Sequence, residues 1–160
     1  LIEDGKGGRN KDARTLFFYI ATVNTPAMVL EMIGVGSQYA LAATDDEGHY
    51  LDGAENYKLT IPADVPAKDF WSLVVYDPQT RSMLQTDQPY PSKNNERNLD
   101  LKANPDGSTT IWFGPKAPAG RESNWIQTVP KKGWFVCLRL YGPLQSWFDK
   151  TWRPGEIEKL

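Results

Sequence analysis

The sequence predicts a mainly β protein, a jelly-roll-like antiparallel β-sandwich with a short N-terminal helical segment. Three observations indicate this fold class. Beyond residue 38 the apolar and aromatic residues come in short runs, and 13 Gly and 12 Pro are available for the turns between them. The turn signals recur about every 8–12 residues, a spacing typical of sandwiches and barrels. No helical pattern separates the runs, as a parallel α/β sheet would require.

The N-terminal part of the chain is expected to differ from the rest. Residues 1–11 are polar and contain several glycines, which is typical of a linker or loop. Residues 12–36 form the predicted helical opening, with Asp12 placed to cap its start. Pro26 suits the first turn of a second short helix, and Gly34 ends it. This apolar opening has no sheet before it to pack against, so we expect a fragment of a longer protein, with a processed mature protein as the alternative.

The sandwich is expected over residues 38–143. Residues 57–61 alternate apolar and polar side chains, the period of a half-buried strand. Residues 70–76 are apolar on both faces and predict a central strand, with Trp71 in the core. The other short runs with strand character are 39–43, 82–84, 108–113, 124–129 and 134–141. Residues 144–160 are expected to form a C-terminal tail that begins with a helical turn.

Composition and length exclude several classes of function. The chain of 160 residues fits one domain, taken as residues 12–160. With 18 Lys and Arg against 20 Asp and Glu, the net charge is −2 and does not suggest a nucleic-acid partner. No apolar run reaches the roughly 18 residues of a membrane span. The single Cys137 and single His49 exclude an intrachain disulfide and the common metal motifs, so no metal and no cofactor are predicted.

A series of short motifs runs through the chain in a fixed order. They are Asp52-Gly53, Tyr57-x-Leu59-x-Ile61-Pro62, Phe70-Trp71-Ser72-Leu73, Tyr76-Asp77, Asn104-Pro105-Asp106-Gly107-Ser108, Glu122-Ser123-Asn124-Trp125, Arg139-Leu140-Tyr141 and Trp152-Arg153-Pro154. Their order and spacing closely resemble the domain of unknown function 1214 (DUF1214) from about Ala13 to the C-terminus. The family often carries an Ile-Gly string in the loop after the Phe-Trp-Ser strand. Here that loop reads Tyr90-Pro91-Ser92-Lys93-Asn94-Asn95, so no ligand role is carried over to it.

The resemblance implies a jelly-roll-like sandwich of a bacterial type but brings no established activity. Members of the family usually form the C-terminal half of a protein whose N-terminal half is the domain of unknown function 1254 (DUF1254). The implied partner is therefore a DUF1254-like domain of the same protein, with a homo-oligomer as the alternative. Because many full-length members look secreted, the resemblance favours a periplasmic or secreted location, although this chain shows no signal peptide.

Glu122, Asn124, Trp125 and Arg139 form the candidate ligand-binding set. Arg139 stands in the middle of the most apolar predicted strand, where an unpaired guanidinium is costly. It is expected either to pair with a carboxylate, with Glu122 and Asp77 as candidates, or to face a cleft. In the first case the set is structural, and in the second it forms a polar and aromatic site for a small molecule or sugar.

Three other features have a structural and a functional interpretation. His49 follows a tight turn and is interpreted as a surface residue rather than a base or ligand, because no partner is evident. Cys137 shares a strand face with Phe135 and Arg139 and is interpreted as an inert buried thiol rather than a nucleophile. The acidic stretch 45–52 is interpreted as hairpin turns rather than a calcium loop, because it lacks the ligand spacing of such loops.

Two classes of function remain open, and no motif identifies a catalytic residue. The first is a structural or interaction domain that packs on another domain of the same protein. The second is a small-molecule or carbohydrate site, catalytic or not, in an aromatic and Arg-lined cleft of the sandwich. The second predicts a concave pocket lined by Trp and Arg at one end of the sheets.

Overall fold

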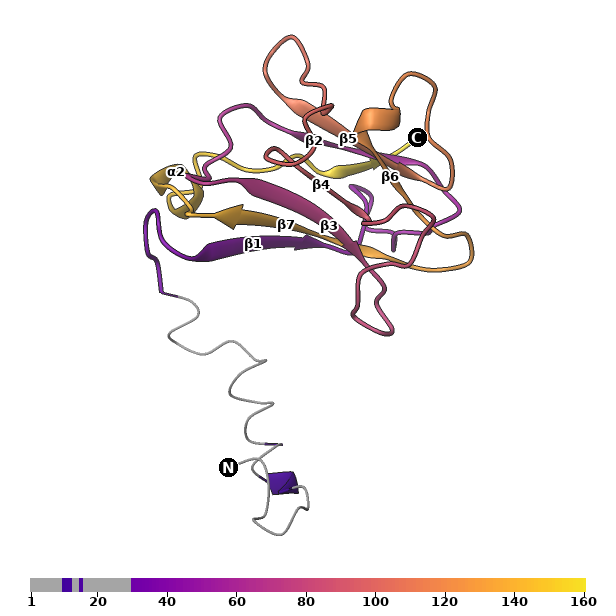
Figure 1. Cartoon of the computed structure of the whole chain (residues 1–160), viewed down its shortest axis with the longest axis horizontal. Helices are drawn as coiled ribbons and strands as arrows, with labels where there is room; N and C mark the ends of the chain where they lie inside the picture. The colour runs from indigo at the N-terminus through magenta and orange to yellow at the C-terminus, as the bar shows by residue number, and fades with distance from the viewer. Residues whose placement is uncertain (1–9, 13–14, 16–29) are drawn as a thin grey trace. The chain divides into compact units, whose positions relative to one another are not determined.

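Two four-stranded β-sheets form a sandwich in the computed structural model (Figure 1). The structure describes residues 10–12, 15 and 30–160. The chain divides into two compact units, residues 1–32 and residues 33–160, and the sandwich is the second. Most of the predicted helical opening lies outside the described residues.

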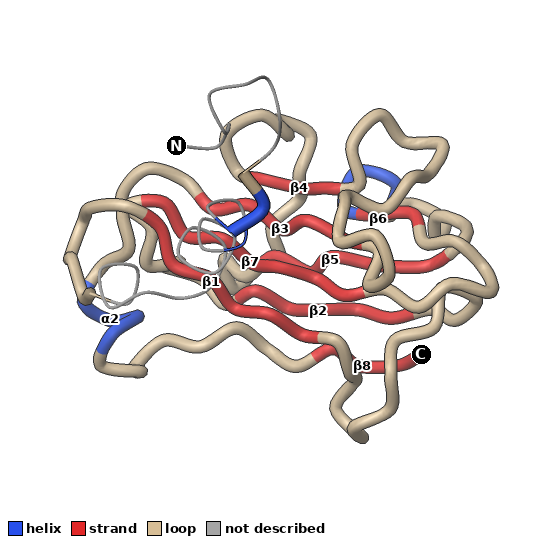
Figure 2. Tube along the Cα trace, turned by 90° about the horizontal axis from the view of Figure 1, so that it is seen from below, coloured by secondary structure: helices blue, strands red, loops and turns tan. Residues whose placement is uncertain are grey.

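The first sheet, called here the β1 sheet, is antiparallel throughout. Its strand order is β1 (Ser37–Ala42), β7 (Phe135–Tyr141), β3 (Trp71–Tyr76) and β4 (Ser92–Asn94). The second, called the β2 sheet, has the order β6 (Trp125–Gln127), β5 (Thr109–Gly114), β2 (Tyr57–Ile61) and β8 (Ile157–Lys159). In Figure 2 the strands of the two layers run in roughly the same direction, as in aligned sandwiches.

The mainly β sandwich expected from the sequence is confirmed, with several differences in detail, among them a short strand, β4, within the predicted loop at 90–95. The expected antiparallel pairing fails at one place, because β5 and β6 are parallel. The Pro- and Gly-rich loop after Gly114 and a 3-10 turn, η2 (Glu122–Asn124), carry the chain back along the sheet before β6 begins. The predicted strand at 82–84 is reduced to an isolated bridge between Met83 and Tyr76.

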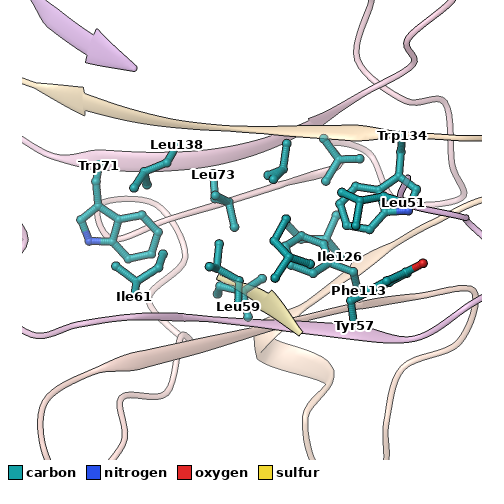
Figure 3. Packing of buried hydrophobic residues seen from close by; sticks show 14 of the residues in the cluster. Leu51, Tyr57, Leu59, Ile61, Trp71, Leu73, Phe113, Ile126, Trp134 and Leu138 are labelled. Carbon is teal, nitrogen blue, oxygen red and sulfur yellow. The ribbon is translucent and has the colours of Figure 1, made fainter. Parts of the chain in front are cut away.

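The core lies between the two layers and follows the alternation of the strands. Figure 3 shows Trp71, Leu73 and Leu138 of the β1 sheet opposite side chains of the β2 sheet. The predicted place of Trp71 in the core is confirmed. Full burial of one such large apolar side chain stabilises the fold by about 1.5–3 kcal/mol. The packing of many such side chains between the sheets is therefore the main interaction that holds the two layers together.

Residues 144–160 are part of the sandwich rather than a loose tail. A single turn, α2 (Gln145–Phe148), is followed by Trp152, which belongs to the buried core. The backbone N–H of Gly155 then donates to the Thr60 carbonyl over 3.0 Å. A Cβ at position 155 would lie 2.6 Å from that oxygen, so the approach requires glycine. This contact brings β8 onto the edge of β2.

None of the helices among the described residues combines the length and apolar character of a membrane span.

Candidate functional site

A cleft of about 280 Å³ opens on the side of the sandwich where β1 and β8 are the edge strands of their sheets. Both layers contribute apolar side chains to this inter-sheet cleft: Leu73, Val136 and Leu138 from one, Leu59 and Ile157 from the other. On β1 the inward-facing residues are Ala40 and Ala42, in register with Leu138 and Val136. The cleft exists because the edge strand contributes methyl groups where the central strands contribute larger side chains.

Two tryptophans form the aromatic part of the inter-sheet cleft. Trp147 comes from α2 and Trp152 from the segment after it, and their ring centroids are 6.5 Å apart. Both indole N–H groups are occupied, since Trp152 donates to the Ala63 carbonyl over 3.0 Å and Trp147 to Gln38 Oε1 over 3.4 Å. The rings therefore present apolar surface to the cleft rather than hydrogen-bond donors.

Charged residues lie at the rim of the inter-sheet cleft. Lys150, Arg153 and Glu156 line it, and all three are exposed. The Lys150 Nζ lies 5.3 Å from the centroid of the Trp147 ring, a cation–π contact. None of the ion pairs found in residues 30–160 involves these three side chains. The rim thus carries two positive charges and one negative charge that are free to meet a ligand.

Asn124, one of the residues proposed from the sequence, serves the local fold. It is buried, and its Oδ1 accepts the Lys102 N–H over 2.8 Å. Its Nδ2 donates to the Lys102 carbonyl over 2.8 Å and to the Thr110 carbonyl over 2.9 Å. Both amide hydrogens and the amide oxygen therefore hold η2 against β5 and against the loop that precedes it.

Glu122 and Trp125 flank Asn124 and also make local contacts. The Glu122 carboxylate accepts the Gly120 N–H over 3.0 Å. Hydrogen bonds from the backbone of Glu122 and from Gly120 lower the pKa of the Glu122 carboxyl group. The Trp125 indole donates to the Gly114 carbonyl over 3.0 Å. These three predicted residues are neighbours at one edge of the β2 sheet.

Arg139 lies in the other layer, on the outer face of the β1 sheet. Its guanidinium donates to the Tyr76 hydroxyl over 2.7 Å and lies over the rings of Tyr39 and Tyr76, at 5.7 and 5.9 Å. The carboxylates proposed as partners are elsewhere: Asp77 pairs with Lys132 at 2.6 Å, and Glu122 belongs to the β2 sheet. The structure brings Glu122, Asn124 and Trp125 together but not Arg139.

The outer face of the β1 sheet around Arg139 is largely aromatic and apolar. Two stacked ring pairs flank it, Phe70 with Tyr141 at 4.1 Å and Tyr76 with Phe135 at 5.2 Å. On the edge strand, Tyr39 and Leu41 keep 55% and 69% of their surface exposed. The Arg139 Nε is buried and has no hydrogen-bond partner in the described part of the chain. This face therefore presents exposed apolar surface, while the Arg139 Nε is buried beneath it.

Cys137 and His49 fit their structural interpretations. Cys137 is 5% exposed, and burial raises the pKa of its thiol. It shares the face of β7 with Phe135 and Arg139, as the alternation of the strand predicts. His49 is exposed near Asp45, whose Oδ1 accepts the His49 N–H over 2.8 Å in the turn. Among the described residues, no group of three or more His, Cys, Asp or Glu is placed to hold a metal ion.

The candidate residues proposed from the sequence, Glu122, Asn124, Trp125 and Arg139, do not line the inter-sheet cleft. Trp147, Lys150, Trp152 and Arg153 do line it, and they are not among the candidate ligand-binding residues that the sequence indicates. The signal available was the clustering of aromatic and basic residues in the last part of the chain, where Trp152-Arg153-Pro154 follows Trp147 and Lys150.

Known proteins provide a family but no activity. No curated protein matches the chain. A crystal structure of the VPA0106 protein from Vibrio parahaemolyticus is similar over 98% of this chain and 36% of that chain, with 24% identity and a TM-score of 0.69. A crystal structure of an uncharacterised protein from Burkholderia cenocepacia is similar over 83% of this chain and 33% of that chain, with 20% identity and a TM-score of 0.51.

Both likenesses concern the fold, and the chain spans about a third of the length of each of these two proteins. The sequence pattern of the family described as "Protein of unknown function (DUF1214)" matches residues 36–145. This match covers most of the sandwich, from the start of β1 to the start of α2. The chain belongs to the DUF1214 family.

Proposed function

We propose that the sandwich is a binding domain that holds a small molecule with an apolar body and an anionic group in the inter-sheet cleft. The observation that carries this proposal is the cleft itself, which is open to solvent and lined by apolar side chains from both sheets. Its volume of about 280 Å³ is just below the range of roughly 300–1,000 Å³ that is typical of small-molecule sites.

The lining favours an apolar body over a sugar. Apart from the rim charges, the side chains that line the inter-sheet cleft are alanine, leucine, isoleucine, valine, proline and tryptophan. Both indole N–H groups are already bonded to the protein. A sugar buried there would leave its hydroxyls without partners, which is unfavourable, whereas an alkyl or aromatic group would only exchange water for apolar contact.

The rim favours a negative charge at the open end of the ligand. Lys150 and Arg153 outnumber Glu156, and none of them is used in an ion pair within the sandwich. A carboxylate held near Lys150 would remain partly hydrated, so its desolvation would be small. The proposed ligand class is therefore a medium-chain alkyl or aromatic monocarboxylate.

The test is a thermal-shift and calorimetric titration with octanoate and decanoate, and with octanol and decanol as uncharged analogues. We expect the carboxylates to raise the melting temperature by several degrees at saturation, because they bind only the native state. Ala42→Phe, which fills the cleft from β1, should abolish this response. Ser37→Phe adds the same ring on the outward face of the same strand and should leave the response intact.

A double charge reversal, Lys150→Glu with Arg153→Glu, should remove the preference for carboxylate over alcohol. The proposal fails if none of the four compounds shifts the melting temperature of the unmodified chain. It also fails if Ala42→Phe responds as strongly as the unmodified chain, because the ligand would then bind elsewhere.

A second function is favoured by the outer face of the β1 sheet, where the apolar side chains of Tyr39 and Leu41 are exposed. We propose that this face packs against a further, DUF1254-like domain of a longer polypeptide. The support is that the chain spans only 36% and 33% of the two solved structures, which leaves most of such a protein to pack against it.

Cysteine accessibility tests the second function, with Leu41→Cys as the probe. The introduced thiol should react rapidly with a maleimide in the present chain and at least tenfold more slowly in a longer natural polypeptide that contains it. A rate that falls as the concentration of the present chain rises would instead indicate a second copy on this face. Equal rates in all samples would contradict docking there.

A further inference from the structure

We propose that a second pocket, next to β4, binds the oxyanion of a small molecule, a carboxylate or a phosphate, through Lys93, Arg97, Asn94 and Asn98. These residues line a pocket of about 490 Å³, called here the Lys93 pocket. It is separate from the inter-sheet cleft, because β4 and β1 are at opposite edges of their sheet.

The burial of the Lys93 side chain is the central observation. Lys93 is in register with Leu73 on the neighbouring strand, and only 9% of its surface is exposed. Within residues 30–160 its ammonium group makes no hydrogen bond and no ion pair, and Asp100 attracts it only from a distance. Burial accordingly lowers the pKa of Lys93, and Asp100 opposes this shift. Most of the side chain is buried while its ammonium group still reaches solvent, and a bound anion would give that group the partner that the described part of the chain does not supply.

The charges that line the Lys93 pocket all have the same sign. Arg97 is exposed at the pocket, and no aspartate or glutamate is among the lining residues. Lys93 and Arg97 therefore create a positive potential that nothing in the lining neutralises. A cationic or neutral ligand would leave Lys93 as it is, whereas an anion would be attracted by both groups.

The two asparagines add donors and no acceptors. Asn98 Oδ1 accepts the Asn94 N–H over 2.9 Å, and Asn94 Oδ1 accepts the N–H groups of Glu96 and Arg97 over 3.1 and 2.6 Å. Because a backbone N–H can only donate, each amide must point its oxygen at the backbone. The Nδ2 groups of both asparagines are left without a partner in the described part of the chain, so the side-chain groups that remain are donors.

The ligand is larger than a bare ion. The pocket volume exceeds that of a single anion, and Tyr90, which also lines it, leaves most of its ring exposed. An aromatic ring of this kind can pack on the apolar face of a small molecule whose oxyanion reaches Lys93. Carboxylates and phosphates share the acceptor geometry that lysine, arginine and amide donors recognise.

The test is calorimetry at constant ionic strength with inorganic phosphate, glucose phosphate, citrate and glucuronate. Lys93→Met and Arg97→Gln are compared with Lys116→Met, which removes the same charge from an exposed site outside the pocket. We expect at least one of these anions to bind the unmodified chain and Lys116→Met with equal affinity, and Lys93→Met and Arg97→Gln at least tenfold more weakly. Binding confined to the citrate and glucuronate arms identifies a carboxylate, and binding confined to the phosphates identifies a phosphoryl group.

The stability of Lys93→Met in the absence of anion is an independent measurement. If Lys93 is kept for a ligand and not for the fold, the variant replaces a partly desolvated, unpaired ammonium group with an apolar side chain and is expected to melt at a higher temperature than the unmodified chain. A lower melting temperature would mean that Lys93 serves the fold. The proposal is overturned by that result, by binding that is equal in all variants, or by no binding of any of the four anions.

Discussion

Arg139 and Tyr76 are joined across the two central strands of the β1 sheet by a hydrogen bond of 2.7 Å from Nη2 to the phenol oxygen. The acceptor is a neutral hydroxyl rather than a carboxylate. Removal of Arg139 therefore leaves no buried negative charge unpaired. Removal of the Tyr76 hydroxyl, in contrast, takes this hydrogen bond away from the half-buried guanidinium.

Tyr76→Phe is accordingly expected to lower the free energy of unfolding by about 1–3 kcal/mol, the usual loss when a charged donor is left unpaired. Tyr39→Phe is the matched control, because the Tyr39 ring also lies under Arg139, and it should be nearly neutral. Adding Arg139→Met to Tyr76→Phe should recover much of the loss. Urea unfolding measures all four chains, and a neutral Tyr76→Phe would show that solvent replaces the hydroxyl.

Cys137 is expected to react slowly with thiol reagents in the folded protein and rapidly in denaturant. Burial limits access and raises the pKa of its thiol, so little thiolate is present at neutral pH. Leu41→Cys in a Cys137→Ala background is the matched comparison, since residue 41 is in register with residue 137 on the neighbouring strand but exposed. Similar native rates at both positions would contradict the burial of Cys137.

Asp77 is expected to make the stability of the fold sensitive to acid. The hydrogen bond from Lys132, at 2.6 Å, and the N–H groups of Gln79 and Thr80 lower its pKa below the ordinary value of 3.8. The stabilisation is complete above this ordinary value and is lost as the pH falls through the lower pKa of the folded state, because the unfolded chain binds the proton first.

As the pH is lowered from 6 to 2, the melting temperature should therefore fall less steeply in Asp77→Asn than in the unmodified chain. Only the unmodified chain has a carboxylate at this position whose stabilisation is lost on protonation. The two curves are expected to converge at the acid end of the series. Parallel curves throughout would show that Asp77 has the same pKa in the folded and unfolded states.

Gly53→Ala is expected to lower the free energy of unfolding by about 1–3 kcal/mol, the usual effect of overpacking. A Cβ at this position would overlap the carbonyl oxygen of Val129 and would lie 2.9 Å from that of Lys132. Gly133→Ala is the control, because the nearest atom to its Cβ is 3.7 Å away. Thermal unfolding of both variants checks the difference, and equal melting temperatures would mean that the loop at Val129 yields freely.

The strands could be predicted from the sequence because each carries its own local signal. Residues 57–61 were predicted and observed with identical bounds, since alternation marks the strand and Pro62 follows it. The parallel pairing of β6 could not be predicted in this way. The direction of β6 is set by the path of the loop after Gly114, and the sequence of β6 itself carries no information about that path.

The sites were less accessible to sequence reasoning, because they depend on which edges come together. Ala40 and Trp152 line one cleft only because β1 and β8 are edge strands on the same side of the sandwich. Lys93 is buried through a three-residue strand, too short for alternation to reveal an inward position. For Arg139 the sequence did indicate a need for an acceptor, but it could not identify the Tyr76 hydroxyl.

The topology of the sandwich also has a consequence for how fast it can form. Ser37 at the start of β1 pairs with Tyr141 at the end of β7, and Leu59 of β2 pairs with Ile157 of β8. Each pairing closes a long loop before any contact compensates for the lost chain entropy. Refolding is therefore expected in the range of milliseconds to seconds, as for other β domains of high contact order. Before β8 has paired with β2, the edge of β2 is free to pair with another chain. Association between chains therefore competes with folding during this period.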